Sequence, residues 1–171
     1  MDTVSDMIDC ATRSLKMVFD DGLDVPPVGG GTDKVRFLYG DGVPLSAWTA
    51  HSAGEGCDHP MLWVRLVQRF RSESFPTPSL SPAPCGAPRG VQIELGVARC
   101  DITDPEPSWT QLESMAEISL DDSWRIETAL CATRNCAVKG NHASGGAMDA
   151  VLPVGPEGGV SAWVGSVWLQ V

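Results

Sequence analysis

The sequence predicts an α+β fold in which a mostly antiparallel sheet is covered on one face by an N-terminal helix and a second helical segment. Three observations lead to this prediction. Apolar residues recur at helical spacing over residues 2–20, they alternate along residues 61–71 and 90–100, and a capping pattern at Ser108 and Gln111 opens another helical stretch. Helices and strands are therefore expected in one layered unit.

The composition is typical of one folded domain. The chain has 171 residues, of which 43% are hydrophobic and 20% are charged, so it can build one core but not two. We expect a single domain over residues 1–171. The net charge of −10 disfavours a protein whose affinity comes from neutralising phosphates, so specific nucleic-acid binding is not expected.

The sequence also predicts a protein that is made and kept in a cytoplasm, away from membranes. Its start lacks the basic and apolar segments of a secretion signal, and no apolar run approaches the ~20 residues that cross a bilayer. In that compartment cysteines are mostly reduced. We therefore expect buried thiols rather than a disulfide framework for Cys10, Cys57, Cys85, Cys100, Cys131 and Cys136.

The first predicted element is an amphipathic helix over residues 2–20. Its apolar positions follow steps of three and four, which gives one face for the core: Val4, Met7, Ile8, Ala11, Leu15 and Val18. The Pro- and Gly-rich residues 24–31 cannot continue it. The acidic pairs Asp20–Asp21 and Asp121–Asp122 are interpreted as helix-end residues that act through capping and the helix dipole rather than as acid–base pairs.

Two short strands follow in this prediction, over residues 35–39 and 45–50, because both runs are β-prone and residues 40–44 form a loop. Residues 51–60 are predicted to be a further loop. A long antiparallel hairpin comes next, made of the strands 61–71 and 90–100. The five prolines of residues 76–90 predict an exposed loop or arm at about 72–90 between these strands.

The capping box at Ser108 predicts a helical stretch that runs towards Thr133, either as one bent helix or as two short ones. A terminal hairpin of residues 148–154 and 160–171 completes the fold.

The polar residues predict no catalytic centre, cofactor or metal. Histidines lie only in predicted loops, and no nucleophile is placed in a recognisable elbow. Zinc sites usually show two closely spaced ligand pairs, and this chain offers one Cys pair at a wide spacing. The thiol and imidazole groups considered were Cys57, His59, Cys85, Cys131, Cys136 and His142. We therefore expect a protein that is not an enzyme.

One face of the strand 61–71 is predicted to be basic, opposite a core face of Leu62, Val64, Leu66 and Phe70. Three arginines on one strand face are not needed for folding, so this face is either solvated or an interface with acidic helices of another subunit. Tryptophan is enriched at interfaces. The predicted interface residues are Trp63, Arg65, Arg69 and Arg71.

These segments together resemble a family of viral proteins. The leading helix, the strand 61–70, the Pro-rich arm, the segment 119–127 and the turn and strand 155–163 are similar to head-to-tail connector proteins of long-tailed (siphovirus-type) actinobacteriophages. Among those proteins the chain most resembles the tail terminator. The resemblance covers most of the chain as an order of elements.

The resemblance implies a homohexameric ring in the virion, at the head–tail junction, that is assembled in the host cytoplasm. Such a ring caps the tail tube, stops its polymerisation and joins it to the head connector or stopper protein. Its partners would be other copies of the chain, the major tail tube protein and the connector. DNA would pass through an acidic lumen without specific binding. The family implies no catalytic residues.

Three alternatives remain open from the sequence. The first is a head-completion or stopper protein of the same connector, for which a β-barrel with fewer helices is expected. The second is a small hydrolase or metal-dependent enzyme built on the Cys- and His-containing loops. The third is a monomeric adaptor that binds one peptide partner.

Overall fold

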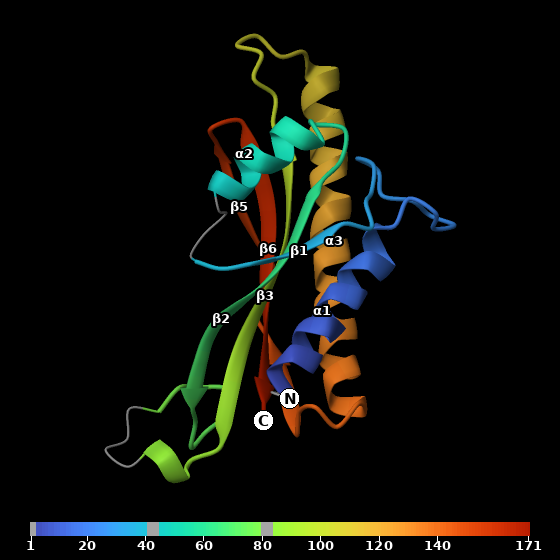
Figure 1. Ribbon diagram of the computed structural model, residues 1–171. Helices are drawn as coiled ribbons and strands as arrows, with labels where there is room; N and C mark the ends of the chain where they lie inside the picture. The colour runs from blue at the N-terminus through green and yellow to red at the C-terminus, as the bar shows by residue number, and fades with distance from the viewer. Residues whose placement is uncertain (1–2, 41–44, 80–83) are drawn as a thin grey trace.

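The computed structural model, which describes residues 3–40, 45–79 and 84–171, is an open sheet with two long helices on one face (Figure 1). These helices are α1 (Thr3–Phe19) and α3 (Trp109–Lys139). The fold is therefore α+β with a mostly antiparallel sheet, an N-terminal helix and a later helix packed against it, as the sequence predicts. No helix in these described ranges is long and apolar enough to cross a membrane.

The sheet has six strands in the order β1-β2-β3-β6-β4, and β5 also pairs with β6. Neighbouring strands are antiparallel, except that β1 and β2 are parallel. A loop of residues 20–34 joins α1 to the first strand. The strands of the sheet are β1 (Val35–Leu38), β2 (Met61–Arg71), β3 (Arg89–Cys100), β4 (Gly145–Met148), β5 (Leu152–Glu157) and β6 (Val160–Gln170).

Helix α1 confirms the predicted amphipathic pattern. Its predicted apolar face is buried between the sheet and α3, with Ile8 partly exposed at the margin of the core. The Asp20 carboxylate accepts a hydrogen bond from the amide of Gly22 at 2.8 Å, which satisfies a donor at the turn that ends the helix. Asp20 therefore has the predicted capping role at a helix end, but the predicted dipole interaction is wrong, because Asp20 follows the C-terminal end of α1, which is the negative end of the helix dipole.

Helix α3 is one continuous helix of 31 residues rather than two. Ser108 and Gln111 form the predicted capping box, and Ile126, Ala129 and Leu130 are buried against the sheet. The prediction that Asp121 and Asp122 lie at a helix end is wrong, since both lie in the middle of α3. Both carboxylates are tolerated in the middle of the helix because each binds an arginine, as described below.

The predicted strand 45–50 is wrong. These residues begin helix α2 (Leu45–Gly54), which also includes part of the predicted loop 51–60. Ala47 and Trp48 of α2 pack on a small apolar cluster on the sheet face away from α1 and α3. Short apolar runs do not distinguish a strand from a helix, and here packing decides. Of the predicted loop 40–44, residues 41–44 lie outside the described residues.

Strand β2 contains an irregularity that the alternating sequence pattern does not reveal. Its pairing register with β3 shifts between Leu66 and Gln68, which inserts one extra residue. A one-residue slip moves every following side chain to the opposite face. The predicted single basic face is therefore wrong: Trp63 and Arg65 lie on the α2 side, whereas Arg69 and Arg71 lie on the side of α1 and α3.

Phe70 changes face for the same reason, so its predicted place in the core is wrong. It is half-buried, and its ring makes an edge contact with the ring of Trp168 at a centroid distance of 5.5 Å. Across the strand pair, Arg69 instead lies opposite Val91, which is a residue of the main core. Directly opposed residues share a face.

The predicted β2–β3 hairpin is confirmed, and backbone hydrogen bonds hold its end together. The amide of Ser72 donates to Pro88 O at 3.0 Å, and that of Ser79 donates to Arg71 O at 2.7 Å. Within the predicted arm, a short 3-10 turn spans Pro84–Gly86, and residues 80–83 lie outside the described residues. The predicted terminal hairpin is confirmed as β5 and β6, but its first strand spans residues 152–157 instead of the predicted 148–154. Strand β4 was not predicted, because Gly145 and Gly146 carry no strand signal.

The prediction of reduced cysteines is wrong for four of the six. One disulfide joins α1 to α3 and closes a sequence separation of 126 residues, and a second joins the loop after α2 to the end of β3. Such long-range pairings cannot be deduced from spacing alone. The pairs are Cys10–Cys136 and Cys57–Cys100, while Cys85 and Cys131 are free thiols.

Candidate functional site

The four predicted interface residues do not form one surface. Trp63 is 0% exposed and Arg65 is 5% exposed, so both are internal. The Trp63 indole nitrogen donates to Glu94 at 3.0 Å, and Arg65 donates to the same carboxylate at 2.7 Å and to Gly40 O at 2.9 Å. The prediction that Trp63 and Arg65 lie on an outer basic face is wrong. They hold β1, β2 and β3 together beneath α2.

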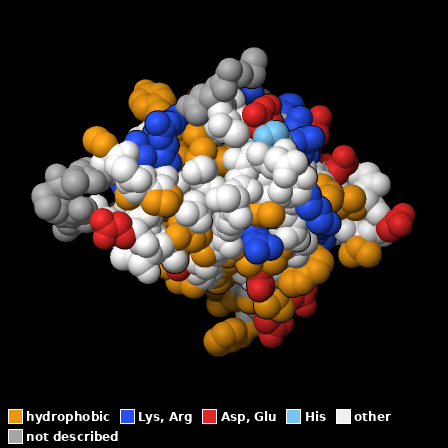
Figure 2. Space-filling model, turned by 90° about the horizontal axis from the view of Figure 1, so that it is seen from below, with side chains coloured by type: hydrophobic (Ala, Val, Ile, Leu, Met, Phe, Trp, Pro, Cys, Tyr) orange, Lys and Arg blue, Asp and Glu red, His pale blue; other side chains and the backbone are white. Residues whose placement is uncertain are grey.

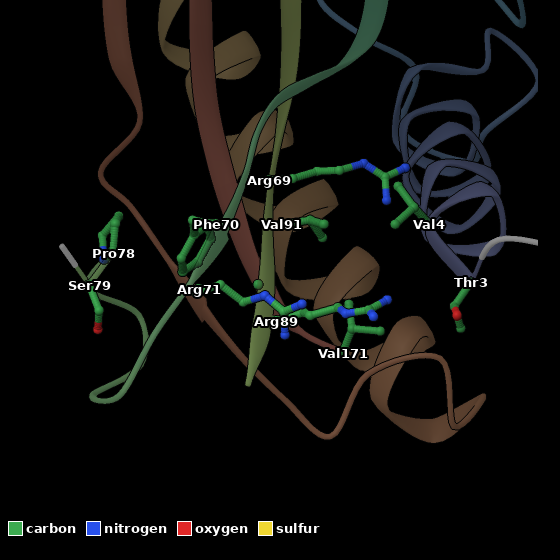
Figure 3. Close-up of a pocket in the computed structure, with 11 residues that line it drawn as sticks. Thr3, Val4, Arg69, Phe70, Arg71, Pro78, Ser79, Arg89, Val91 and Val171 are labelled. Atoms are coloured by element: carbon green, nitrogen blue, oxygen red, sulfur yellow. The ribbon is translucent and has the colours of Figure 1, made fainter. Parts of the chain in front are cut away.

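Arg69 and Arg71 instead lie at the lower end of the sheet, where they line a groove of about 590 Å³ (Figure 3). Arg89 of β3 is the third arginine of this groove. Thr3 and Val4 at the start of α1 line it as well, and Figure 3 shows the side chain of Arg69 directed towards Val4. We call this site the arginine groove.

Apolar side chains form the rest of the groove lining. Val91 and Val4 are buried at its inner side, and Phe70 and Pro78 also border it. Arg71 is held in place because its guanidinium donates to Ala87 O at 2.7 Å. The groove therefore offers both positive charge and apolar contact area.

The charge of the groove opposes that of the chain as a whole. None of the lining side chains that the structure describes is acidic, although the main-chain end at Val171 also lines the groove, whereas the protein has a net charge of −10. The start of α1 adds the positive end of a helix dipole. Figure 2, which views the molecule from this end, shows basic side chains among hydrophobic and uncharged ones, with acidic side chains mainly towards the outline.

The pairing of Arg71 with Arg89 carries a cost for folding. The two residues are directly opposed across β2 and β3, and like charges in that position destabilise a sheet. An anionic group between them would reverse the sign of this interaction. Arginine is suited to that contact because its planar guanidinium binds carboxylate or phosphate in a bidentate manner. The groove therefore fits an acidic ligand or partner segment.

Sequence reasoning did not single out Arg89, since it lies at the border of the Pro-rich connection. The one available signal is the number of residues between Arg71 and Arg89 in the predicted hairpin. That number tells which residues of the two strands are paired only when the turn and the bulge are known, and neither can be read from the strand pattern.

Two further arginines have a structural role. Arg99 binds Asp122 at 2.6 Å and 2.9 Å and also donates to Gly30 O, while Arg125 binds Asp121 at 2.7 Å. Both pairs fix the loop after α1 against α3. Burial raises the pKa of Asp122 above its usual range, and the hydrogen bonds from Arg99 oppose this without cancelling it.

The thiol and imidazole groups considered for a metal site are dispersed. Cys57 and Cys136 are joined to other cysteines, and the ring of His59 contacts Gly31 O at 3.2 Å. Among residues 3–40, 45–79 and 84–171, the His, Cys, Asp and Glu side chains form no group of three or more that could hold a metal ion.

Neither protein families nor curated proteins give a match to this chain. The chemistry of the arginine groove itself indicates what it can bind. It combines three guanidinium groups, a helix N-terminus and apolar walls at one end of the molecule. That combination is suited to recognition of an acidic and partly apolar protein segment.

Proposed function

We propose that this chain is a structural protein of a phage virion, a tail terminator that acts through protein–protein contacts and is not an enzyme. In this proposal it forms a homohexameric ring that caps the tail tube, stops its polymerisation and joins it to the head connector or stopper protein. The observation that carries the proposal is the arginine groove at the base of the β2–β3 hairpin, in a chain that is otherwise acidic. The order of elements noted in the sequence supports the same family.

A ring places a specific demand on its subunit. Each copy must present two different surfaces that fit one another, so that contacts run head to tail and close after a full turn. The arginine groove supplies one basic surface. The excess of acidic side chains elsewhere supplies complementary ones, and opposite charges favour correct docking.

The β2–β3 hairpin gives a second means of contact. It extends away from α1 and α3 at the lower end of the molecule (Figure 1). The Pro-rich arm at about 72–90 would reach a neighbouring subunit or the tail tube. The net negative charge would let DNA slide through the lumen without binding. The ring would stand at the head–tail junction after assembly in the host cytoplasm.

The architecture supports a terminator over a head-completion or stopper protein. A stopper is expected to be a β-barrel with fewer helices, whereas this chain has an open sheet and a helix of 31 residues. The enzyme alternative gains no support from the described residues, in which candidate ligands are joined in disulfides or lie apart.

Native mass spectrometry of the purified chain, alone and with tail tube protein, tests the proposal. We expect a hexamer, and we expect tubes that grow in its presence to be shorter and capped in electron micrographs. Without residues 74–88 the subunit should fold, as judged by its thermal unfolding, but assemble poorly. A chain that stays monomeric and leaves tube growth unchanged would overturn the proposal, and an unaltered ring without residues 74–88 would refute the role of the arm.

A further inference from the structure

The end of the molecule opposite the arginine groove carries an exposed tryptophan. Trp109 is the first residue of α3 and is 80% exposed, and Leu112 one turn later is also exposed. The capping box at Ser108 holds this end of the helix in place. Burial of a tryptophan contributes more free energy than burial of most other side chains, so Trp109 is an anchor without an intramolecular pocket.

Acidic residues lie close to this tryptophan in the sequence. Glu113 lies four positions after Trp109 and therefore on the same side of α3. Glu106 and Asp104 are exposed in the segment before the helix, where the Asp104 carboxylate accepts a hydrogen bond from the Glu106 amide at 3.0 Å. Residues 101–124 contain no lysine or arginine. The start of α3 thus combines exposed acidic side chains with an exposed tryptophan.

We propose that the arginine groove of one copy binds the start of α3 of a second copy, with the Trp109 side chain in the groove. This inference rests on the proposed function, because it names the partner surface of the ring contact. The indole would lie beside Arg71 and Arg89, since guanidinium groups stack favourably on tryptophan. Glu106 and Glu113 would then pair with the arginines, which relieves the repulsion between Arg71 and Arg89.

The two surfaces cannot meet within one chain. They lie at opposite ends of the molecule (Figure 1), and α3 alone spans about 45 Å between its first and last residues. A contact between them therefore joins two copies. It is a head-to-tail contact, which leaves one unused groove and one unused tryptophan on every pair, so that further copies can add and a ring forms when the rotation between copies closes.

Substitution of the anchor tests this pairing. Trp109→Ala should raise the dissociation constant between subunits at least about thirtyfold, as expected for a central aromatic anchor. Trp124→Ala is the matched control, since Trp124 lies on the same helix and is 59% exposed but is about 22 Å further along the helix axis than Trp109. The control should assemble as the unaltered chain does. Equal loss in both variants would overturn the pairing.

Charge reversal tests the same contact from both sides. Arg89→Glu and Glu113→Arg should each shift the ring to smaller species in native mass spectrometry, and the double variant should restore it. A mixture of Arg89→Glu and Trp109→Ala chains is more specific. Each chain keeps one intact surface, so a head-to-tail contact predicts dimers that cannot grow further. Circular dichroism verifies that each variant is folded.

The outcomes separate this inference from the proposed function. Rings that survive both Arg89→Glu and Trp109→Ala, and still cap tail tubes, would overturn the pairing and leave the tail terminator proposal intact. Restoration in the double variant, or dimers in the mixture, would support the pairing even if the rings did not cap tubes. A failure to cap tubes would then count against the proposed function alone.

Discussion

The indole ring of Trp63 on β2 lies directly against Gly96 on β3, and a Cβ at Gly96 would overlap atoms of that ring. We therefore expect Gly96→Ala to lower the free energy of unfolding by about 1–3 kcal/mol, as is usual for overpacking in a core. Urea denaturation measures this loss.

Gly54→Ala is the matched control, because Gly54 ends α2, the helix whose Trp48 packs on the same cluster, and a Cβ there meets nothing within 4 Å. Its free energy of unfolding should change little or increase. If Gly96→Ala were as stable as this control, Trp63 would not be fixed over β3 as described.

The carboxylate of Glu94 neutralises a buried arginine. Glu94→Leu would remove the acceptor for both Trp63 and Arg65 and deprive the buried Arg65 cation of its ion pair with Glu94. We expect a loss of about 3–5 kcal/mol in the free energy of unfolding. The double substitution Arg65→Met with Glu94→Leu should recover most of that loss, and a double that stays as unstable as the single would contradict this interpretation.

The two disulfides predict a definite thiol count. Purified under oxidising conditions and unfolded without a reductant, the chain should react with two equivalents of a thiol reagent, at Cys85 and Cys131. After reduction it should react with six. Six reactive thiols in the oxidised protein would contradict the pairing.

Loss of the Cys10–Cys136 bond by Cys10→Ser should lower the free energy of unfolding by about 2–4 kcal/mol, because this bond closes a long loop.

Asp122 should give a measurable pH dependence. Burial raises its pKa in the folded state above the unfolded value, so the folded chain holds this proton more tightly. Its contribution to stability is therefore full below the unfolded pKa and is lost as the pH rises through the folded pKa. The free energy of unfolding of the unaltered chain, relative to Asp122→Asn, should increase as the pH falls from 7 to about 4. A decrease would mean that the Arg99 ion pair dominates instead.

The sequence predicts those elements whose pattern is long and regular. Helix α1, the hairpin of β2 and β3 and the start of α3 follow from periodicity and capping, which are local signals. Residues 45–54 could not be predicted in the same way, because their helix depends on packing of Trp48 against distant strands. Strand β4 likewise exists only through its pairing with β6.

The site was predicted in part. The sequence correctly marks the strand 61–71 as unusually basic, but it assigns Trp63, Arg65, Arg69 and Arg71 to one face. A single extra residue after Leu66 divides them into an internal pair and a groove pair. The alternation of apolar and polar residues does not reveal a bulge, because almost any residue type can form the bulge. The third arginine, Arg89, becomes part of the site only through the pairing of the two strands.

The outer edge of β6 has a consequence for how this protein behaves at high concentration. Its two ends are occupied by different short strands, β4 at residues 167–170 and β5 mainly at residues 160–164. Strand β5 also contains Pro153 and Pro156, which offer no amide to an incoming chain. This border of the sheet is a poor template for cross-β growth, so copies crowded together are not expected to add strands there.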